Sequence, residues 1–187
     1  MTRSVARNHP LAILYQPRRT VQGLLERKAG HGLAVSIAVL FGVVQSLRAV
    51  LFSGGGNPVL LLVAGAVVGL AGLYFFAWLL RNFARWFGGH AEQWEVRLAL
   101  GLGLLPWTLL FGLLPLLLVR VGDAAAAQTY YPLFMVGLVY GYVILLLGLS
   151  SALRLTVLKT FFCLVVATLV SIFPLTLVAQ LIFGPAT

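Results

Sequence analysis

The stretch "RNFARWFGGHAEQWEVR", Arg81 to Arg97, is the long polar interruption in a chain that is otherwise almost continuously apolar. It gathers three arginines, two glutamates and a histidine around the pair Gly88 and Gly89. The runs on both sides are about 20 apolar residues long, which is the length that a helix needs to cross the hydrocarbon core of a bilayer. We therefore interpret this stretch as the loop between two membrane-crossing helices, and it fixes how the chain is threaded.

The overall composition is that of an integral membrane protein. Of the 187 residues, 61% are hydrophobic and 9% are charged, and the mean hydropathy is +1.03. These values exclude a water-soluble domain of this length. A segment that faces lipid must satisfy its own backbone hydrogen bonds, as a helix does, and the two-residue alternation of a membrane barrel is absent. The sequence therefore predicts an all-α fold, a polytopic membrane helix bundle.

Five apolar stretches are long enough to span the membrane, and they cover residues 33–52, 59–80, 98–119, 133–153 and 155–183. The segment "SGGGNP" between the first two is short enough to be a tight turn. Proline removes a backbone donor from a helix, so Pro106 and Pro115 in the third span and Pro174 in the fifth predict kinks or breaks.

The distribution of charge gives the orientation, because Lys and Arg near span ends are retained on the cytoplasmic side. With five spans, eleven of the 13 basic residues fall on one face, and Arg120 alone falls on the other. We therefore expect an integral membrane protein with the N-terminus in the cytoplasm and the C-terminus outside. The eleven residues are Arg3, Arg7, Arg18, Arg19, Arg27, Lys28, Arg81, Arg85, Arg97, Arg154 and Lys159.

Residues 1–30 are predicted to form a cytoplasmic arm, and residues 31–187 the five-span domain. Within the arm, "PRRTVQGLLERK" begins with Pro17 and places Val21, Leu24 and Leu25 on one helical face, which predicts an amphipathic helix at the membrane interface. A solvated linker helix is the alternative. The net charge of +9 favours anionic lipid headgroups over nucleic acid as partners. The expected inner-leaflet contacts are Arg18, Arg19, Arg27, Lys28, Arg81 and Arg85.

Catalytic chemistry is not expected. The acidic residues Glu26, Glu92, Glu95 and Asp123 fall outside the predicted spans, as do His9, His31 and His90. Cys163 is expected to be an apolar packing residue. The "HAEQWE" segment could bring His90, Glu92 and Glu95 to a metal, but a solvated loop with both glutamates at the N-terminus of the third helix is favoured. We predict no enzyme activity, no metal and no cofactor.

Arg48 is the prominent charge inside a span, and Gln45 lies one turn deeper on the same helical face. In one interpretation Arg48 reaches the outer headgroups or pairs with Asp123. In the other, Gln45, Arg48 and Asp123 belong to an outward-opening polar pocket that receives an anionic group such as a lipid phosphate.

Two small-x-x-x-small patterns permit close helix packing. These are Gly65 with Gly69 in the second span, and Gly137 with Gly141 in the fourth. They could serve the interior of one chain or the seam of a homo-oligomer, and the sequence leaves both open.

Three stretches carry a family resemblance. "HPLAILYQPRRTVQGLLE", with Pro17 and Thr20, resembles the opening Pro-x-x-Thr segment of the Yip domain family, the Rab- and Ypt-interacting polytopic membrane proteins and their bacterial relatives. "FGGHAEQWEVRLALGLGLLPWTL" is similar to the family's Gly-Gly loop and following span, with Gly88, Gly89 and Pro106 as the matching residues. "VYGYVILLLGLSSAL" is similar to its fourth span.

The resemblance implies the same five-span topology in a short, bacterial-type member, and so an integral protein of the bacterial inner membrane. Eukaryotic members carry a long cytosolic N-terminal region that engages trafficking partners, whereas the arm here has about thirty residues, which argues against Rab binding. The leading hypothesis is a non-enzymatic organiser or adaptor of membrane components that acts through its basic cytoplasmic face, where protein partners could dock. A small transporter, channel or lipid-translocating protein with a pocket near Gln45 and Arg48 is the alternative.

Overall fold

The computed structural model describes residues 10–53, 57–121 and 130–183, and within these ranges the chain is helical without strands. Five segments of the described chain are long and apolar enough to cross a membrane, which confirms the predicted all-α bundle. They are His31–Arg48, Pro58–Trp86, Gln93–Leu113, Tyr131–Leu153 and Val157–Pro174.

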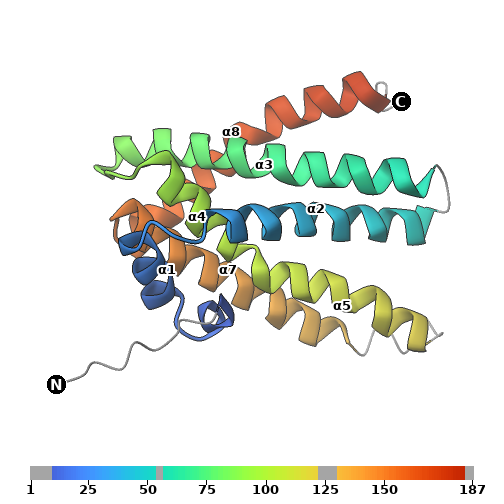
Figure 1. Ribbon diagram of the computed structural model, residues 1–187. Coiled ribbons are helices and arrows are strands. Elements are labelled where there is room, and N and C mark those ends of the chain that lie inside the picture. Colours follow the sequence, from blue (N-terminus) through green and yellow to red (C-terminus); the bar gives the residue numbers. More distant parts are fainter. Residues whose placement is uncertain (1–9, 54–56, 122–129, 184–187) are drawn as a thin grey trace.

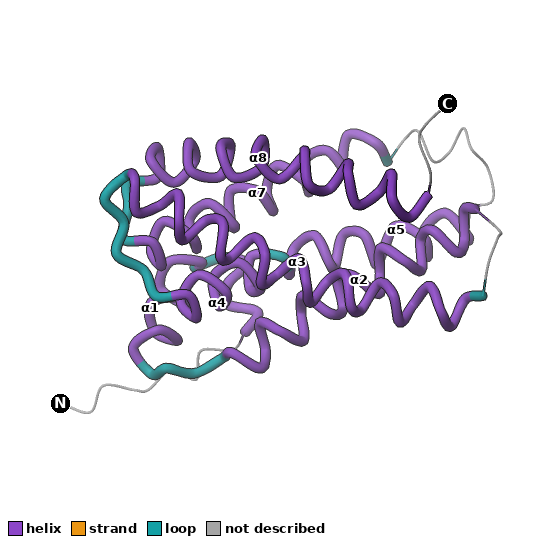
Figure 2. Tube along the Cα trace, turned by 90° about the horizontal axis from the view of Figure 1, so that it is seen from above, coloured by secondary structure: helices purple, strands orange, loops and turns teal. Residues whose placement is uncertain are grey.

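The long helices run in roughly the same direction in both views, as members of one bundle do (Figures 1 and 2). Helix α2 packs along α3, α5 packs along α7, and α4 lies between α2, α3 and α7. The short helix α1 lies across one end, against α7. The elements are η1 (Pro10–Leu14), α1 (Pro17–Glu26), α2 (His31–Ser53), α3 (Pro58–Trp86), α4 (Gln93–Gly103), α5 (Leu105–Val121), α7 (Tyr131–Leu153) and α8 (Val157–Phe183).

Helix α3 is longer than the sequence predicted. The second span was expected to end at residue 80, but the helix continues to Trp86, so Arg81 and Arg85 lie on a helix and not in a loop. The helical pattern persists because Phe83 and Ala84 continue its buried face. The helix ends where Gly88 takes a φ of +85°, a backbone conformation that glycine adopts without strain. The connecting loop is therefore only residues 87–92.

The third span is broken into two helices, as its proline predicted. Helix α4 ends at Gly103 and α5 begins at Leu105, directly before the buried Pro106. Proline cannot donate a backbone hydrogen bond to the preceding turn, so the regular ladder is interrupted here. The helices continue without a break through the other two prolines, at positions 115 and 174.

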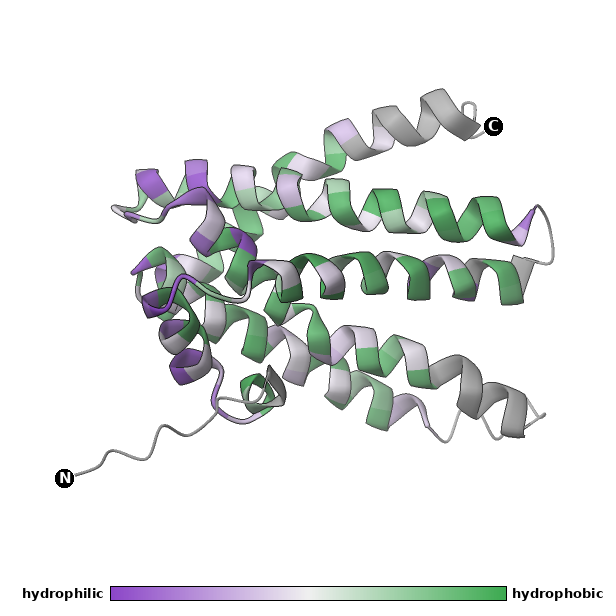
Figure 3. Cartoon of the chain, viewed as in Figure 1, coloured by the Kyte–Doolittle hydropathy of each residue, from purple (hydrophilic) through white to green (hydrophobic). Residues whose placement is uncertain are grey.

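The best-buried part of the bundle lies near the end that α1 covers. Leu98 and Leu102 of α4 and Leu149 and Leu153 of α7 are wholly buried, and α4 packs against α7 over this region. Hydrophilic residues also gather at this end, while the rest of the described helices is mostly apolar (Figure 3). We call it the basic end, defined by α1, the 87–92 loop and the turn at residues 154–156.

The amphipathic helix α1 rests on protein with its apolar face. Val21 is wholly buried and lies over Gly148 of α7, where an added methyl would be 3.5 Å from Val21 Cγ2. Arg18 and Arg19 of the same helix are exposed. Before it, η1 lies beside α7, and the Tyr140 hydroxyl donates a hydrogen bond to the Leu14 carbonyl. The N-terminal arm is thus fastened to the bundle at two levels of α7.

Candidate functional site

The cations predicted to contact the inner leaflet lie together at the basic end. Three segments that are distant in the sequence meet there, namely α1, the 87–92 loop with the end of α3, and the turn between α7 and α8 (Figures 1 and 3). Arg81 is half-buried, and the other cations of this end are exposed: Arg18, Arg19, Arg27, Lys28, Arg85, Arg154 and Lys159.

An ion pair between a buried carboxylate and an exposed arginine ties this end together. Arg154 Nη2 lies 3.0 Å from Glu95 Oε1, and Arg154 Nη1 donates to the His90 carbonyl at 2.9 Å. The second carboxylate oxygen of Glu95 accepts the Glu92 backbone N–H at 2.7 Å, as in the return half of a capping box. Glu92 and Glu95 lie at the N-terminus of the helix, as predicted, with Glu92 at the N-cap and Glu95 in the first turn of α4. The prediction that this segment is solvated is wrong for Glu95, because its side chain is only 8% exposed.

Cations from three helices bind the backbone of the 87–92 loop. Besides Arg154, Arg81 of α3 donates to the Ala91 carbonyl at 3.4 Å, and Lys159 of α8 donates to the Phe87 carbonyl at 3.5 Å. Each carbonyl dipole offsets part of a positive charge. The loop therefore joins α3, α7 and α8.

Both glycines of the family-like motif have a physical role in this loop. Gly88 provides the positive φ that ends α3. Gly89 is buried, and a methyl group there would lie 3.1 Å from the Leu153 carbonyl oxygen and 3.0 Å from that of Ala84. Only a residue without a side chain allows the loop to approach the end of α7 this closely.

The side chains considered for a metal do not converge. His90 is exposed, Glu95 pairs with Arg154, and Glu92 accepts the Trp94 indole N–H at 2.6 Å. No group of three His, Cys, Asp or Glu residues suited to a metal is present in the part of the chain that the structure describes.

Arg97 lies against an aromatic ring. Its guanidinium lies 4.7 Å from the centre of the Tyr74 ring, and its Nε is buried without a hydrogen-bond partner among the described residues. The charge pattern predicted Arg97 on the basic face. It did not predict the contact with Tyr74, because Tyr74 belongs to another helix.

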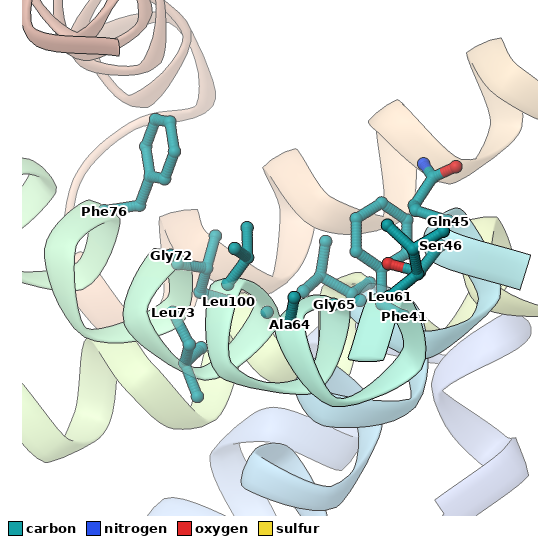
Figure 4. Close-up of a pocket in the computed structure, with 14 residues that line it drawn as sticks. Phe41, Gln45, Ser46, Leu61, Ala64, Gly65, Gly72, Leu73, Phe76 and Leu100 are labelled. Carbon is teal, nitrogen blue, oxygen red and sulfur yellow. The ribbon is translucent and has the colours of Figure 1, made fainter. Parts of the chain in front are cut away.

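A mainly apolar groove of about 500 Å³ lies between α2, α3 and α4. Gln45 and Ser46 lie at one end of it, and Phe76 lies toward the other (Figure 4). Arg48 flanks the polar end, where Nη1 donates to Gln45 Oε1 at 2.9 Å and the guanidinium lies 4.7 Å from the centre of the Phe111 ring. Asp123, the third residue of the predicted polar pocket, lies outside the described residues.

The predicted small residues lie at helix crossings inside one chain. Gly65 and Gly69 of α3 face α2, where Gly42 and Ser46 form a third small-x-x-x-small pattern that was not predicted. A methyl group at Gly42 would come within 2.0 Å of the Gly65 carbonyl oxygen.

The second glycine pair faces α5. A methyl group at Gly137 would meet Leu110, and one at Gly141 would lie 2.2 Å from Trp107 Nε1. That indole nitrogen donates to the Leu138 carbonyl at 3.1 Å. The remaining residues of the family-like motif occupy structural positions. Pro17 lies in the first turn of α1, and Thr20 and Pro106 are buried.

Five apolar helical segments and one cationic end define a polytopic α-helical membrane protein. The Yip1 domain family model matches residues 11–179, nearly the whole chain. The chain therefore belongs to the Yip1 domain family, which confirms the resemblance drawn from three stretches of its sequence. Comparison with curated proteins and with solved structures gives no match.

Proposed function

We propose that this Yip1-family protein is a non-enzymatic organiser of the bacterial inner membrane. Its basic end faces the cytoplasm, concentrates anionic lipids around the bundle and offers a surface to protein partners. The observation that carries the proposal is the set of exposed cations at one end of an apolar bundle, with Arg154–Glu95 as the one ion pair among the described residues.

The attractions of the exposed cations to an anionic membrane add together. A Lys or Arg near an anionic membrane surface contributes on the order of 1 kcal/mol of attraction. Arg18, Arg19, Arg27 and Lys28 all lie on or directly after α1, which is itself packed onto the bundle. Since α1 is packed against α7, its cations keep a fixed position relative to the bundle, and they attract the anionic lipids next to the protein.

The test is the lipid composition that surrounds the protein. We expect the protein, extracted from bacterial membranes with its annular lipids in polymer discs, to carry a higher fraction of anionic lipid than the bulk membrane. Neutralising Arg18, Arg19, Arg27 and Lys28 to Gln should remove most of this excess. An Arg48→Gln variant is the control at the other end of the bundle. Equal composition inside and outside the discs would refute the proposal.

A second candidate function is the binding or translocation of a lipid, and the groove favours it. The groove has an apolar wall, with Gln45 at one end and Arg48 beside it, which suits an amphiphile. The apolar chain of such a ligand would lie along α3, and its headgroup would contact the side-chain amide of Gln45. Lipid flux in proteoliposomes tests this function. Arg48→Leu should abolish the flux. An absence of flux in the unmodified protein would exclude lipid translocation, and the organiser function would remain.

A further inference from the structure

A separate polar pocket of about 540 Å³ lies at the basic end, between α1 and the C-terminal end of α7. Arg18 and Gln22 line it from α1, Ser150 and Ser151 from the last turn of α7, and Arg154 and Thr156 from the following turn. None of these residues except Arg18 was a candidate site residue in the sequence. They are brought together because Val21 seats α1 on Gly148.

The charge of this pocket is positive. Both of its charged lining residues are arginines. Arg154 shares its charge with Glu95, but its side chain remains 62% exposed and has donors beyond those given to Glu95 and His90. Glu26, the acidic residue of α1, is eight residues from Arg18, which corresponds to about 12 Å along the helix. A phosphate group would therefore find two guanidinium groups, of which that of Arg154 is also paired with Glu95, and the carboxylate of Glu26 lies further away.

The hydroxyl groups of the pocket are already oriented. Ser150 Oγ donates to the Leu147 carbonyl at 2.9 Å and Ser151 Oγ donates to the Gly148 carbonyl at 2.7 Å, so both serine oxygens are left to accept. A bare anion gains nothing from acceptors. A phosphodiester whose headgroup carries hydroxyls can use both the arginine donors and the serine acceptors. Its phosphate accepts from the arginines, and a headgroup hydroxyl donates to a serine oxygen.

An exposed apolar track leads away from this pocket along α7. Val143, Val139 and Val136 lie 7, 11 and 14 positions before Ser150, which places them on the same helical face. They are 44%, 65% and 65% exposed. An acyl chain attached to a headgroup at Ser150 would lie along these side chains, whereas a free phosphate or a soluble phosphopeptide would make no use of them.

We propose that this pocket binds one anionic glycerophospholipid with a hydroxylated headgroup of the phosphatidylglycerol type. Its phosphate lies between Arg18 and Arg154, its headgroup hydroxyls donate to Ser150 and Ser151, and one acyl chain follows the valine track of α7. The site rests on the proposed function in that it selects, from the anionic lipids gathered at the basic end, one that is held in place.

Native mass spectrometry of the detergent-extracted protein tests the site. The protein is supplied with equal amounts of phosphatidylglycerol and phosphatidylcholine of the same acyl chains. We expect one phosphatidylglycerol to remain bound under activation that removes other lipids. Arg18→Gln, which removes a charge-assisted contact from an exposed position, should lower the retained fraction about tenfold. Arg27→Gln removes the same charge from the end of the same helix outside the pocket, and it should change retention less than about twofold.

Three results would overturn the site. These are equal retention of the two lipids, equal losses in the two arginine variants, and displacement of the lipid by inorganic phosphate alone. If anionic lipid is still enriched in polymer discs in any of these cases, the single site fails and the organiser function stands. If the enrichment is absent too, both fail. The melting temperatures of Arg18→Gln and Arg27→Gln should match, which separates a lost site from a lost fold.

Discussion

At the scale of single residues, the ion pair between Glu95 and Arg154 is unequal. The Glu95 side chain is 8% exposed, whereas that of Arg154 is 62% exposed. Water can therefore solvate the arginine if its partner is removed, but it reaches the carboxylate poorly. Removing one partner of a buried pair is costly mainly because of the charge that is left behind.

We expect Arg154→Gln to destabilise the protein more than Glu95→Gln does. Arg154→Gln leaves the buried carboxylate without its cation and should lower the free energy of unfolding by roughly 2 to 3 kcal/mol. Glu95→Gln leaves an exposed guanidinium and a weakened contact to the Glu92 N–H, at a cost of about 1 kcal/mol. Unfolding by denaturing detergent gives both values.

The double variant and an exposed acid serve as controls for this pair. The combined Glu95→Gln and Arg154→Gln variant should lose less than the two single variants together, because no unpaired buried charge remains. Glu26→Gln makes the same charge change on the exposed side of α1 and should be nearly neutral. Strict additivity of the two single effects would show that the pair is not coupled.

Local side-chain contacts could be predicted from the sequence, and distant ones could not. The spacing of Gln45 and Arg48 predicts that they lie on one helical face, and in the structure Arg48 donates a hydrogen bond to Gln45. Glu95 and Arg154 are 59 positions apart, and their contact depends on how α4 packs against α7. The partners of Arg97 and of the pocket at Arg18 depend on packing in the same way.

At the scale of elements, the crossing of α2 and α3 depends on the absence of side chains. A methyl group at Gly42 would be 2.0 Å from the Gly65 carbonyl oxygen and 2.9 Å from the Gly69 Cα. Both are backbone atoms, so a change of rotamer cannot relieve the overlap. The two helices must instead move apart, and the groove that they line would change with them.

Gly42→Ala is therefore expected to destabilise the bundle. Overpacking of this kind costs about 1 to 3 kcal/mol. Gly72→Ala is the matched control, because it lies on α3 at the edge of the same groove and an added methyl there meets nothing within 4 Å. It should be neutral or slightly stabilising, since alanine favours a helix more than glycine does. Equal stability of the two variants would contradict the observed crossing.

The helices themselves were largely predictable because span length and hydropathy are set by the bilayer. The predicted and observed helices differ where a buried apolar face continues past the predicted end of a span, and where a proline lies within a span. Helix α3 carries its buried face past residue 80 into the polar stretch, so charge alone marked the end of that span too early. Of the three prolines within the predicted spans, Pro106 coincides with a break between two described helices, whereas helix continues through Pro115 and Pro174.

At the scale of the whole molecule, the odd number of spans separates the two ends of the described chain. Helix α1 lies at the basic end, while α8 finishes at the other end of the bundle (Figure 1). Asn57, the N-cap of α3, is also at that far end, because α3 runs from it toward the basic end. If lysine and arginine set the orientation, every connection at the basic end is cytoplasmic.

Cysteine labelling tests this orientation in intact cells and in inverted vesicles. We expect a membrane-impermeant maleimide to label His90→Cys only in inverted vesicles, because His90 is exposed in the loop at the basic end. It should label Asn57→Cys only in intact cells, since Asn57 is exposed at the opposite end. The native Cys163 is wholly buried, and a Cys163→Ala background removes it without adding volume. Labelling of both positions from the same side would contradict a membrane crossing by α3, which is the one span between them. Labelling of each position from the wrong side would keep the bundle but turn the basic end outward, where the anionic lipids of the inner leaflet could not reach Arg18.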